Sequence, residues 1–274
     1  MDPEFLSESD AGLLQIKHSS LRLTTKTGAS LHYSYLKSPC SEPAHLIVFL
    51  NGLMTDKTSW LAIMSKVSQA MPSHPTMLAY DRYGQGLTED RDPQDKDREE
   101  GYGHDALDVT RDLHQLILQF VEKHFVAPQE PPHIILVGAS IGCAIARLYA
   151  QEHPRSVAGL LFLDSIMANS NFDFWPDPDA LDFDPSSLPE DITLDVLREQ
   201  RAAFAARFSP NVVNQEGFNR RNLASLLPHS DAPKLQGPGG KGPYIMVVGH
   251  DPETFAEESL EVSRFPILSQ VPSF

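Results

Sequence analysis

The sequence predicts an α/β fold in which a mostly parallel sheet is covered by helices on both faces. Three apolar runs carry this prediction, because a strand that is buried on both faces has a continuous apolar sequence. They lie at residues 45–50, 77–80 and 134–137. Helical patterns separate these runs, and strands that alternate with helices form parallel sheets. With 274 residues, the chain is long enough for one sizeable core.

The residues before the third run predict a hairpin and two helices. Residues 21–25 and 31–35 alternate between apolar and polar side chains around a turn, as the strands of a half-buried hairpin do. Helices are expected at residues 59–70 and 106–124, the second with an apolar stripe. For residues 89–100, which are dense in charge, we favour a solvated loop over a phosphate or metal site.

A Gly-x-Ser-x-Gly sequence connects the third run to a helical pattern. It spans Gly138 to Gly142, with Ser140 at its centre. A strand, a sharp turn and a helix are the context that a nucleophile elbow requires. The turn is so tight that side chains two residues before and after the serine would collide, which explains the two glycines.

Two further strands and a long insertion follow the elbow. Strands are expected at residues 157–163 and 244–249, and a flexible glycine-rich linker at residues 237–243. The intervening segment is too long for a simple crossover, and helices are expected in it at residues 194–208 and 219–227.

Three motifs together resemble the serine hydrolases of the α/β-hydrolase superfamily. They are Asn51-Gly52, the loop from Asp81 to Gly86, and the elbow around Ser140, each after one strand. The resemblance covers about residues 20–252 and implies an α/β-hydrolase fold, with an eight-stranded sheet and an inserted lid. It divides the chain into a core of residues 6–163 and 236–274 and a lid of residues 164–235. Residues 1–5 read as a cloning remnant.

The resemblance implies how Ser140 would react. A serine hydroxyl needs a base and donors for the oxyanion that forms. The family pattern assigns these donors to the N–H groups of Leu53 and Ile141, and Gly52 would let the backbone approach the substrate. Many relatives have histidine in place of Asn51, whose side chain is expected to be structural here. An elbow serine argues against epoxide hydrolases and haloalkane dehalogenases, which have aspartate at this position.

Two aspartates are candidates for the catalytic acid. Asp164 ends the strand at residues 157–163, and Asp251 follows the strand at residues 244–249. The family usually takes its acid from the later position, so Asp251 is expected and Asp164 is the alternative.

The catalytic base is the difficulty, because the family's histidine follows the acid in the chain. The last of the eleven histidines is His250, so none follows Asp251. Three explanations remain open. In the first, truncation or splicing has removed the last strand and the histidine from this chain. In the second, another histidine, such as His250 or His229, serves as the base. In the third, the protein binds a ligand without turnover.

Composition and the lid restrict the substrate and the partners. The formal net charge of −15 argues against nucleic acid and anionic membranes as partners, and no apolar run approaches the length of a membrane span. Phe172 and Trp175 are expected to line an apolar substrate pocket with Gly52. Two unpaired cysteines, Cys40 and Cys143, favour the cytoplasm.

The sequence therefore predicts a hydrolase of small to medium, largely apolar carboxylic esters, without cofactor or metal. The alternative is a truncated or inactive ligand-binding protein of the same fold. A sheet truncated at its edge would also expose apolar surface, so self-association through that edge is expected.

Overall fold

The computed structural model describes residues 15–40, 44–125, 130–165, 176–188, 192–229, 231–249 and 251. The chain forms two compact units. The first comprises Met1–Ala168 and Val213–Val248, and the second comprises Asn169–Val212 and Gly249–Phe274. The predicted boundaries of the lid, residues 164–235, stay a prediction.

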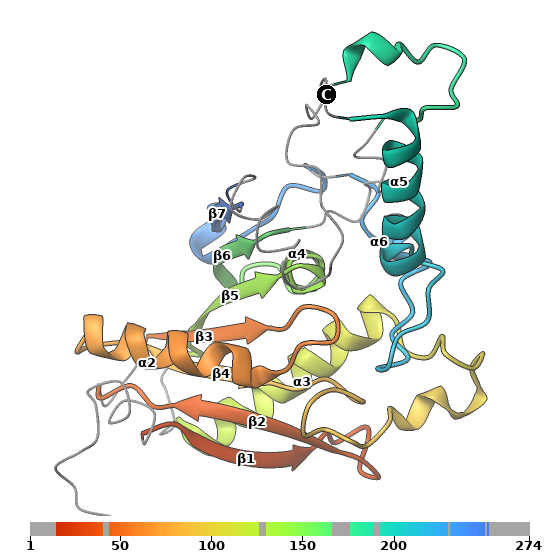
Figure 1. The fold of residues 1–274 in the computed structure, drawn as a ribbon. Coiled ribbons are helices and arrows are strands. Elements are labelled where there is room, and N and C mark those ends of the chain that lie inside the picture. The colour runs from red at the N-terminus through yellow and green to blue at the C-terminus, as the bar shows by residue number, and fades with distance from the viewer. Residues whose placement is uncertain are drawn as a thin grey trace, which may run out of the picture. The chain divides into compact units, whose positions relative to one another are not determined.

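A seven-stranded sheet organises the first unit, in the order β1-β2-β4-β3-β5-β6-β7 (Figure 1). The five strands from β4 to β7 in this order pair in parallel, whereas β2 pairs antiparallel with β1 and β4. The predicted mostly parallel sheet is confirmed. The strands are β1 (Lys17–Arg22), β2 (Ser30–Leu36), β3 (His45–Leu50), β4 (Thr76–Tyr80), β5 (His133–Ala139), β6 (Val157–Leu163) and β7 (Tyr244–Val248).

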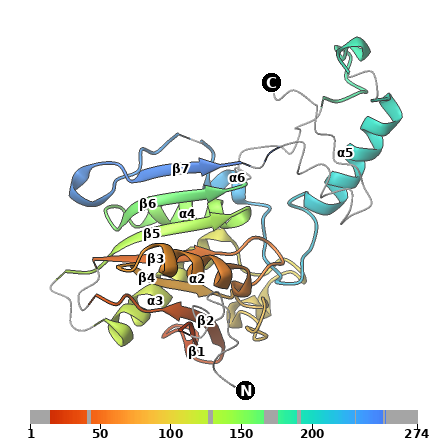
Figure 2. The same cartoon turned by 60° about the vertical axis from the view of Figure 1, so that its left-hand side comes forward.

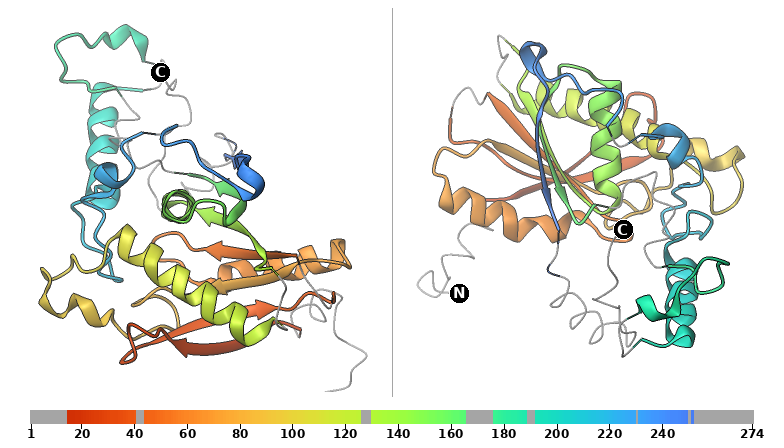
Figure 3. Two further views of the ribbon diagram at one scale, coloured as in Figure 1. Left: turned by 180° about the vertical axis from the view of Figure 1, so that it is seen from behind. Right: turned by 90° about the horizontal axis from the view of Figure 1, so that it is seen from above.

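Helices cover both faces of this sheet (Figure 3). Helix α2 (Leu61–Ala70) covers one face, and helices α3 (Ala106–His124) and α4 (Ile141–Glu152) cover the other. Successive side chains of β3 point to opposite faces of the sheet. Phe49 packs with Trp60 and Met64 on one face, whereas Val48 packs in the cluster of α3 and α4 on the other. The predicted burial of the central strands on both faces is confirmed.

Local capping fixes the ends of α3 at the predicted residues. The Asp105 carboxylate accepts hydrogen bonds from the N–H groups of Leu107 and Asp108, and the Asp108 carboxylate accepts one from the N–H of Asp105. These reciprocal bonds form a capping box, which satisfies N–H groups that the helix itself leaves without acceptors.

Two predicted helices differ from the observed elements. The helix expected at residues 59–70 begins with a separate 3₁₀ turn, η2 (Lys57–Trp60), before α2. The helix expected at residues 219–227 is only the short α6 (Leu223–Leu226). The expected first turn is absent, and Asn219 instead forms an isolated parallel bridge with Asp105, with its N–H donating to the carbonyl oxygen of His104. The expected linker at residues 237–243 contains a short 3₁₀ helix, η5 (Pro238–Gly240).

The charged segment at residues 89–100 is largely exposed, as expected of a solvated loop, although not at every residue. It contains a 3₁₀ helix, η3 (Pro93–Asp97), and Asp92 beside it is buried. The buried Lys26 ammonium binds the carboxylates of Asp92 at 2.6 Å and Asp112 at 2.7 Å. This pairing allows the acidic segment to pack against the core.

Over the described residues, strand β7 is the last in the sheet (Figure 2). All five of its residues are exposed. The eighth strand that the resemblance implies would follow it in residues 252–274, which lie outside the described residues. The predicted strand at residues 244–249 is confirmed as β7.

The second unit contains η4 (Pro185–Ser187) and α5 (Leu194–Phe208), which confirms the helix expected at residues 194–208. The hydroxyl of Thr193 caps α5 by accepting from the N–H of Val196. Arg198 of α5 forms an exposed ion pair with Asp179 at 2.8 Å. Over the residues described, no helix has both the length and the apolar character of a membrane span.

Candidate active site

Ser140 occupies a sharp turn between β5 and α4, with φ 51° and ψ −120°. Residues with a side chain rarely adopt a positive φ, so this backbone is strained. A Cβ on Gly138 would lie 2.6 Å from the carbonyl carbon of Gly142, and one on Gly142 would collide with the carbonyl oxygen of Leu50. The predicted strand–turn–helix geometry and the steric need for both glycines are confirmed.

The loop after β3 lies beside this elbow. Leu50 pairs with Gly138 in the register of β3 and β5, so the two strands end at the same level. A Cβ on Gly52 would lie 3.6 Å from the Cβ of Ser140. Ile141 is the first residue of α4, and the N–H groups of a first helical turn have no acceptor within the helix. Gly52 and the flanking Leu53 are therefore brought to Ser140 and Ile141.

Of the two acid candidates, Asp164 lies in the same unit as Ser140. The N–H of Ser140 donates to the carbonyl oxygen of Leu163 at 3.1 Å, and the N–H of Asp164 donates to that of Val248 at 2.8 Å. Asp164 has a positive φ of 48° and is exposed at this edge of the sheet.

Asp251 is an exposed residue of the second unit, and its place in a site with Ser140 stays a prediction. His250, Phe172 and Trp175 lie outside the described residues.

Several of the described histidines have other partners. His45 and His133 begin β3 and β5, at the ends of these strands opposite to Ser140. His114 and His153 stack with ring centroids 3.8 Å apart, and His104 binds Asp95 at 2.9 Å. Across residues 15–249, excluding the gaps given above, no hydrogen bond joins Ser140 to a histidine. The described structure thus does not identify the base.

A buried polar network supports the loop after β3. The Asn51 amide donates to the Tyr80 carbonyl oxygen and to Gln85, both at 2.8 Å, and accepts from the Trp60 indole at 2.8 Å. This agrees with the predicted structural role of the Asn51 side chain. Arg82 and Glu216 complete the network, with Arg82 Nε donating to Glu216 at 2.8 Å.

Comparison with known proteins decides the family. The profile of the alpha/beta hydrolase family matches residues 47–268. This chain belongs to that family. The match spans the elbow, the loop after β3 and the loop after β4, as the three motifs had indicated. No curated protein sequence matches the chain significantly.

Several solved structures are similar to this alpha/beta hydrolase. A bacterial membrane phospholipase A has 20% identity and a TM-score of 0.41, covering 57% of this chain and 42% of its own. The epoxide hydrolase VrEH1 from Vigna radiata has 18% identity and a TM-score of 0.41, covering 55% and 38%. A mutant of VrEH2 has 16% identity and a TM-score of 0.48, covering 86% and 81%. The chain thus spans less than half the length of the first two structures.

The hydrolase has a buried thiol directly behind the elbow. Cys143 Sγ lies 3.1 Å from the carbonyl oxygen of Gly138, and burial raises the pKa of this thiol to about 12. A thiol with so high a pKa stays protonated near neutral pH, so Cys143 is not a competing nucleophile. Cys40 and Cys143 are both unpaired.

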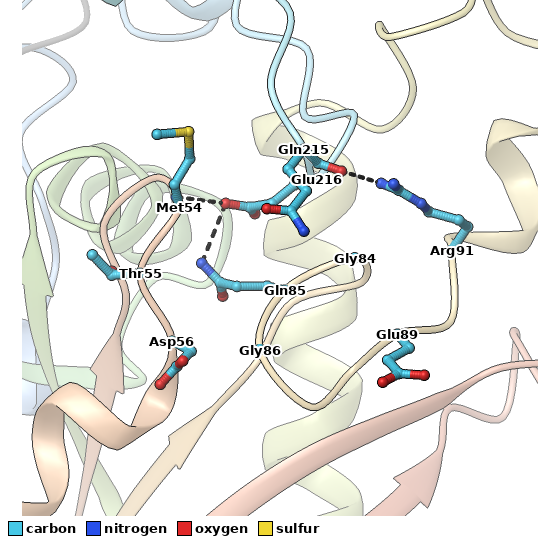
Figure 4. Close-up of a pocket in the computed structure, with 10 residues that line it drawn as sticks. All are labelled: Met54, Thr55, Asp56, Gly84, Gln85, Gly86, Glu89, Arg91, Gln215 and Glu216. Carbon is cyan, nitrogen blue, oxygen red and sulfur yellow. Dashed lines mark hydrogen bonds between the residues drawn. The ribbon is translucent and has the colours of Figure 1, made fainter.

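A polar cleft adjoins the loop after β3 (Figure 4). Its volume is about 390 Å³, and Ser140 is not among the residues that line it. The lining residues include Met54, Gln85, Glu89 and Glu216.

A second polar cluster consists of Asp92, Asp95 and His104, whose candidate ligand atoms lie within 4.8 Å of one another. The Lys26 ammonium contacts Asp92 and already supplies positive charge there. We therefore assign no ion to this cluster.

Sequence reasoning missed Arg82, Gln85 and Glu216 as residues of the site. Arg82 and Gln85 lie within the Asp81–Gly86 motif, but the motif alone does not indicate which residues their side chains contact. Glu216 carried no local signal, because its partners precede it by more than a hundred residues.

Proposed function

We propose that this chain is a serine hydrolase that cleaves a small to medium, largely apolar carboxylic ester through an acyl-enzyme. The observation that carries the proposal is the strained elbow, which holds Ser140 beside Gly52. In the proposed reaction, Ser140 Oγ attacks the ester carbonyl and the alcohol leaves. Water then releases the acid and restores the serine.

The N–H groups of Leu53 and Ile141 are proposed to hold the oxyanion. Their support is the closeness of the two loops and the open first turn of α4. Losing one such donor costs about 2.7–4 kcal/mol of transition-state stabilisation in other enzymes.

Asp251 is proposed to orient the histidine base, and Asp164 is the alternative acid. The two unpaired cysteines fit a proposed cytoplasmic location.

A binding protein without turnover is the second candidate. It is favoured by the histidine contacts within the described residues, none of which reaches Ser140. Without its base, a triad enzyme keeps only about 10³–10⁴-fold acceleration over water.

An intact mass after incubation with a fluorophosphonate tests the proposal, because only an activated serine reacts quickly. We expect one adduct on the native protein and none on Ser140→Ala. A scan of His→Ala variants that starts with His250 and His229 then identifies the base. Absence of an adduct on the folded native protein would reject the hydrolase in favour of the binding protein.

A further inference from the structure

Arg82, in the loop after β4, directs its guanidinium at the loop after β3. Its Nη1 donates to the carbonyl oxygen of Asn51 and its Nη2 to that of Gly52, both at 2.8 Å. Gln85 Nε2 adds a donor to the Gly52 oxygen at 3.1 Å. Because the guanidinium is a rigid planar fork, it fixes two successive carbonyl groups relative to each other.

The direction of one carbonyl determines the direction of the next N–H. The Gly52 carbonyl and the Leu53 N–H belong to the same planar trans peptide, so they point in opposite directions. Holding the Gly52 oxygen toward Arg82 and Gln85 therefore turns the Leu53 N–H away from them. Hydrogen bonds to the carbonyl also polarise the peptide, which strengthens its N–H as a donor.

Glu216 holds the following residue. Its Oε1 accepts from the N–H of Met54 at 3.1 Å (Figure 4). The same carboxylate also binds Arg82. Met54 has a φ of 61°, a conformation that costs energy for a residue with a side chain. The Met54 N–H is thus occupied, and this contact fixes the residue that directly follows Leu53.

The ion pair that makes these contacts is buried. The side chains of Arg82 and Glu216 are 3% and 1% exposed. Burial disfavours the charge on Arg82, but the Glu216 carboxylate outweighs this and holds the pKa of Arg82 above its ordinary value. Arg82 therefore keeps its charge, and the burial of both side chains keeps water from competing for their hydrogen bonds.

We propose that Arg82 and Glu216 are positioning residues that aim the Leu53 N–H at the oxyanion of the ester reaction. The inference rests on the proposed function. Glu216 acts through Met54 and Arg82, and touches no reacting atom. The pair therefore contributes to kcat rather than to substrate binding, because the oxyanion develops in the transition state.

The variants Glu216→Ala and Glu216→Gln, measured on p-nitrophenyl butyrate, test this role. Glu216→Ala should lower kcat by about 10–100-fold with little change in KM, as small displacements of catalytic groups do. Glu216→Gln should recover most of this loss, since its amide oxygen still accepts from Met54. Glu89→Gln, an exposed acid in the same cleft, is the control and should leave kcat unchanged.

Hydrogen exchange of the peptide covering residues 51–56 gives a readout that does not need activity. Glu216→Ala should accelerate exchange there, because the Met54 N–H loses its acceptor, whereas Glu89→Gln should not. If the native protein has no Ser140-dependent turnover, the proposed function is rejected. The hydrogen exchange of residues 51–56 then tests by itself whether Glu216 holds the loop after β3 in place. Unchanged exchange in folded Glu216→Ala would then overturn the inference.

Arg82→Lys covers the case in which Glu216→Ala does not fold. Lysine keeps the charge but cannot bridge two carbonyl groups and a carboxylate at once. A folded Arg82→Lys protein with reduced kcat and an unchanged KM supports the inference. Native kcat in folded Arg82→Lys or Glu216→Ala would overturn it.

Discussion

The backbone at Ser140 is strained, and it would not be strained if this residue were glycine. Its φ of 51° is costly for any residue with a Cβ, and glycine adopts such angles freely. The neighbouring Gly138 and Gly142 cannot relax the turn, because each already lies against backbone atoms. The backbone conformation that places the Ser140 hydroxyl for reaction therefore lowers the stability of the fold.

Ser140→Gly should therefore be more stable than Ser140→Ala. Alanine retains the strain, whereas glycine removes it, and positive-φ strain is worth about 1–3 kcal/mol before the entropy of glycine is subtracted. We expect the free energy of unfolding of Ser140→Gly to exceed that of Ser140→Ala by about 1 kcal/mol in urea titrations. At Ser59, which is exposed in η2, the order should reverse. Equal stability of the two Ser140 variants would contradict the strain.

Single residues differ in how far the sequence predicts them. Ser140 and its glycines could be identified because the constraint lies within five consecutive residues. Lys26 looked like a turn residue, yet it pairs with Asp92 and Asp112 in the core. Burial raises the pKa of Asp112 to about 6, although Lys26 opposes this. Such pairs depend on residues that meet only in the folded chain.

Helices and strands were predictable where local signals fix their ends. The Asp105 capping box fixes the start of α3, and the Thr193 cap fixes the start of α5. The short α6 was not predictable in the same way. Asn219 pairs instead with the residues that precede α3, and this contact joins distant parts of the sequence.

The contact between α3 and α4 contains two histidines that resist protonation. His114 of α3 stacks on His153, the residue that follows α4, with the rings inclined by 10°. Burial, and the neighbouring His114, lower the pKa of His153 to about 4, and burial also lowers that of His114.

This histidine pair predicts a loss of stability in acid. In the unfolded chain a histidine has a pKa of about 6.5, so between about pH 6.5 and 4 the unfolded state binds more protons. The contribution of His153 is complete above this window and is lost as the pH falls through it. Urea midpoints at pH 7.5 and 5.0 should differ less in His153→Gln than in the native protein. A pH dependence that His153→Gln leaves unchanged would refute this assignment.

The order of the strands places the candidate site at the carboxyl ends of the central strands. The central strands β3 and β5 end side by side, and β6 follows, so that Gly52, Ser140 and Asp164 leave the sheet together. The alternation of strands and helices predicted this arrangement. The base could not be predicted, because the chain departs from the family pattern after Asp251.

The edge strand β7 has apolar side chains that are unusually exposed. Ile245, Met246, Val247 and Val248 are 44–63% exposed, so the part of the chain that the structure describes covers neither face of the strand. An edge strand with an apolar sequence and no charged residue is a template for pairing with another chain. We expect a second copy of this chain to pair with it.

Sizing at several protein concentrations tests this self-association. The double variant Ile245→Lys/Val247→Lys should shift the protein toward the monomer, because both charges lie on one face of the edge strand. Leu118→Lys, at an exposed apolar position of α3, is the control and should not. A native protein that elutes as one monomer peak at all concentrations would argue against the expectation.

The contact between Arg82 and Glu216 also has a consequence for protein synthesis. Residues leave the ribosome in sequence order, so strands β1 to β6 and Ser140 emerge well before Glu216. A growing chain can bury its central strands while the Met54 N–H still lacks its acceptor. On the proposed role of this pair, the Leu53 N–H is aimed at the oxyanion only once Glu216 has been made, so this part of the site is completed late in synthesis.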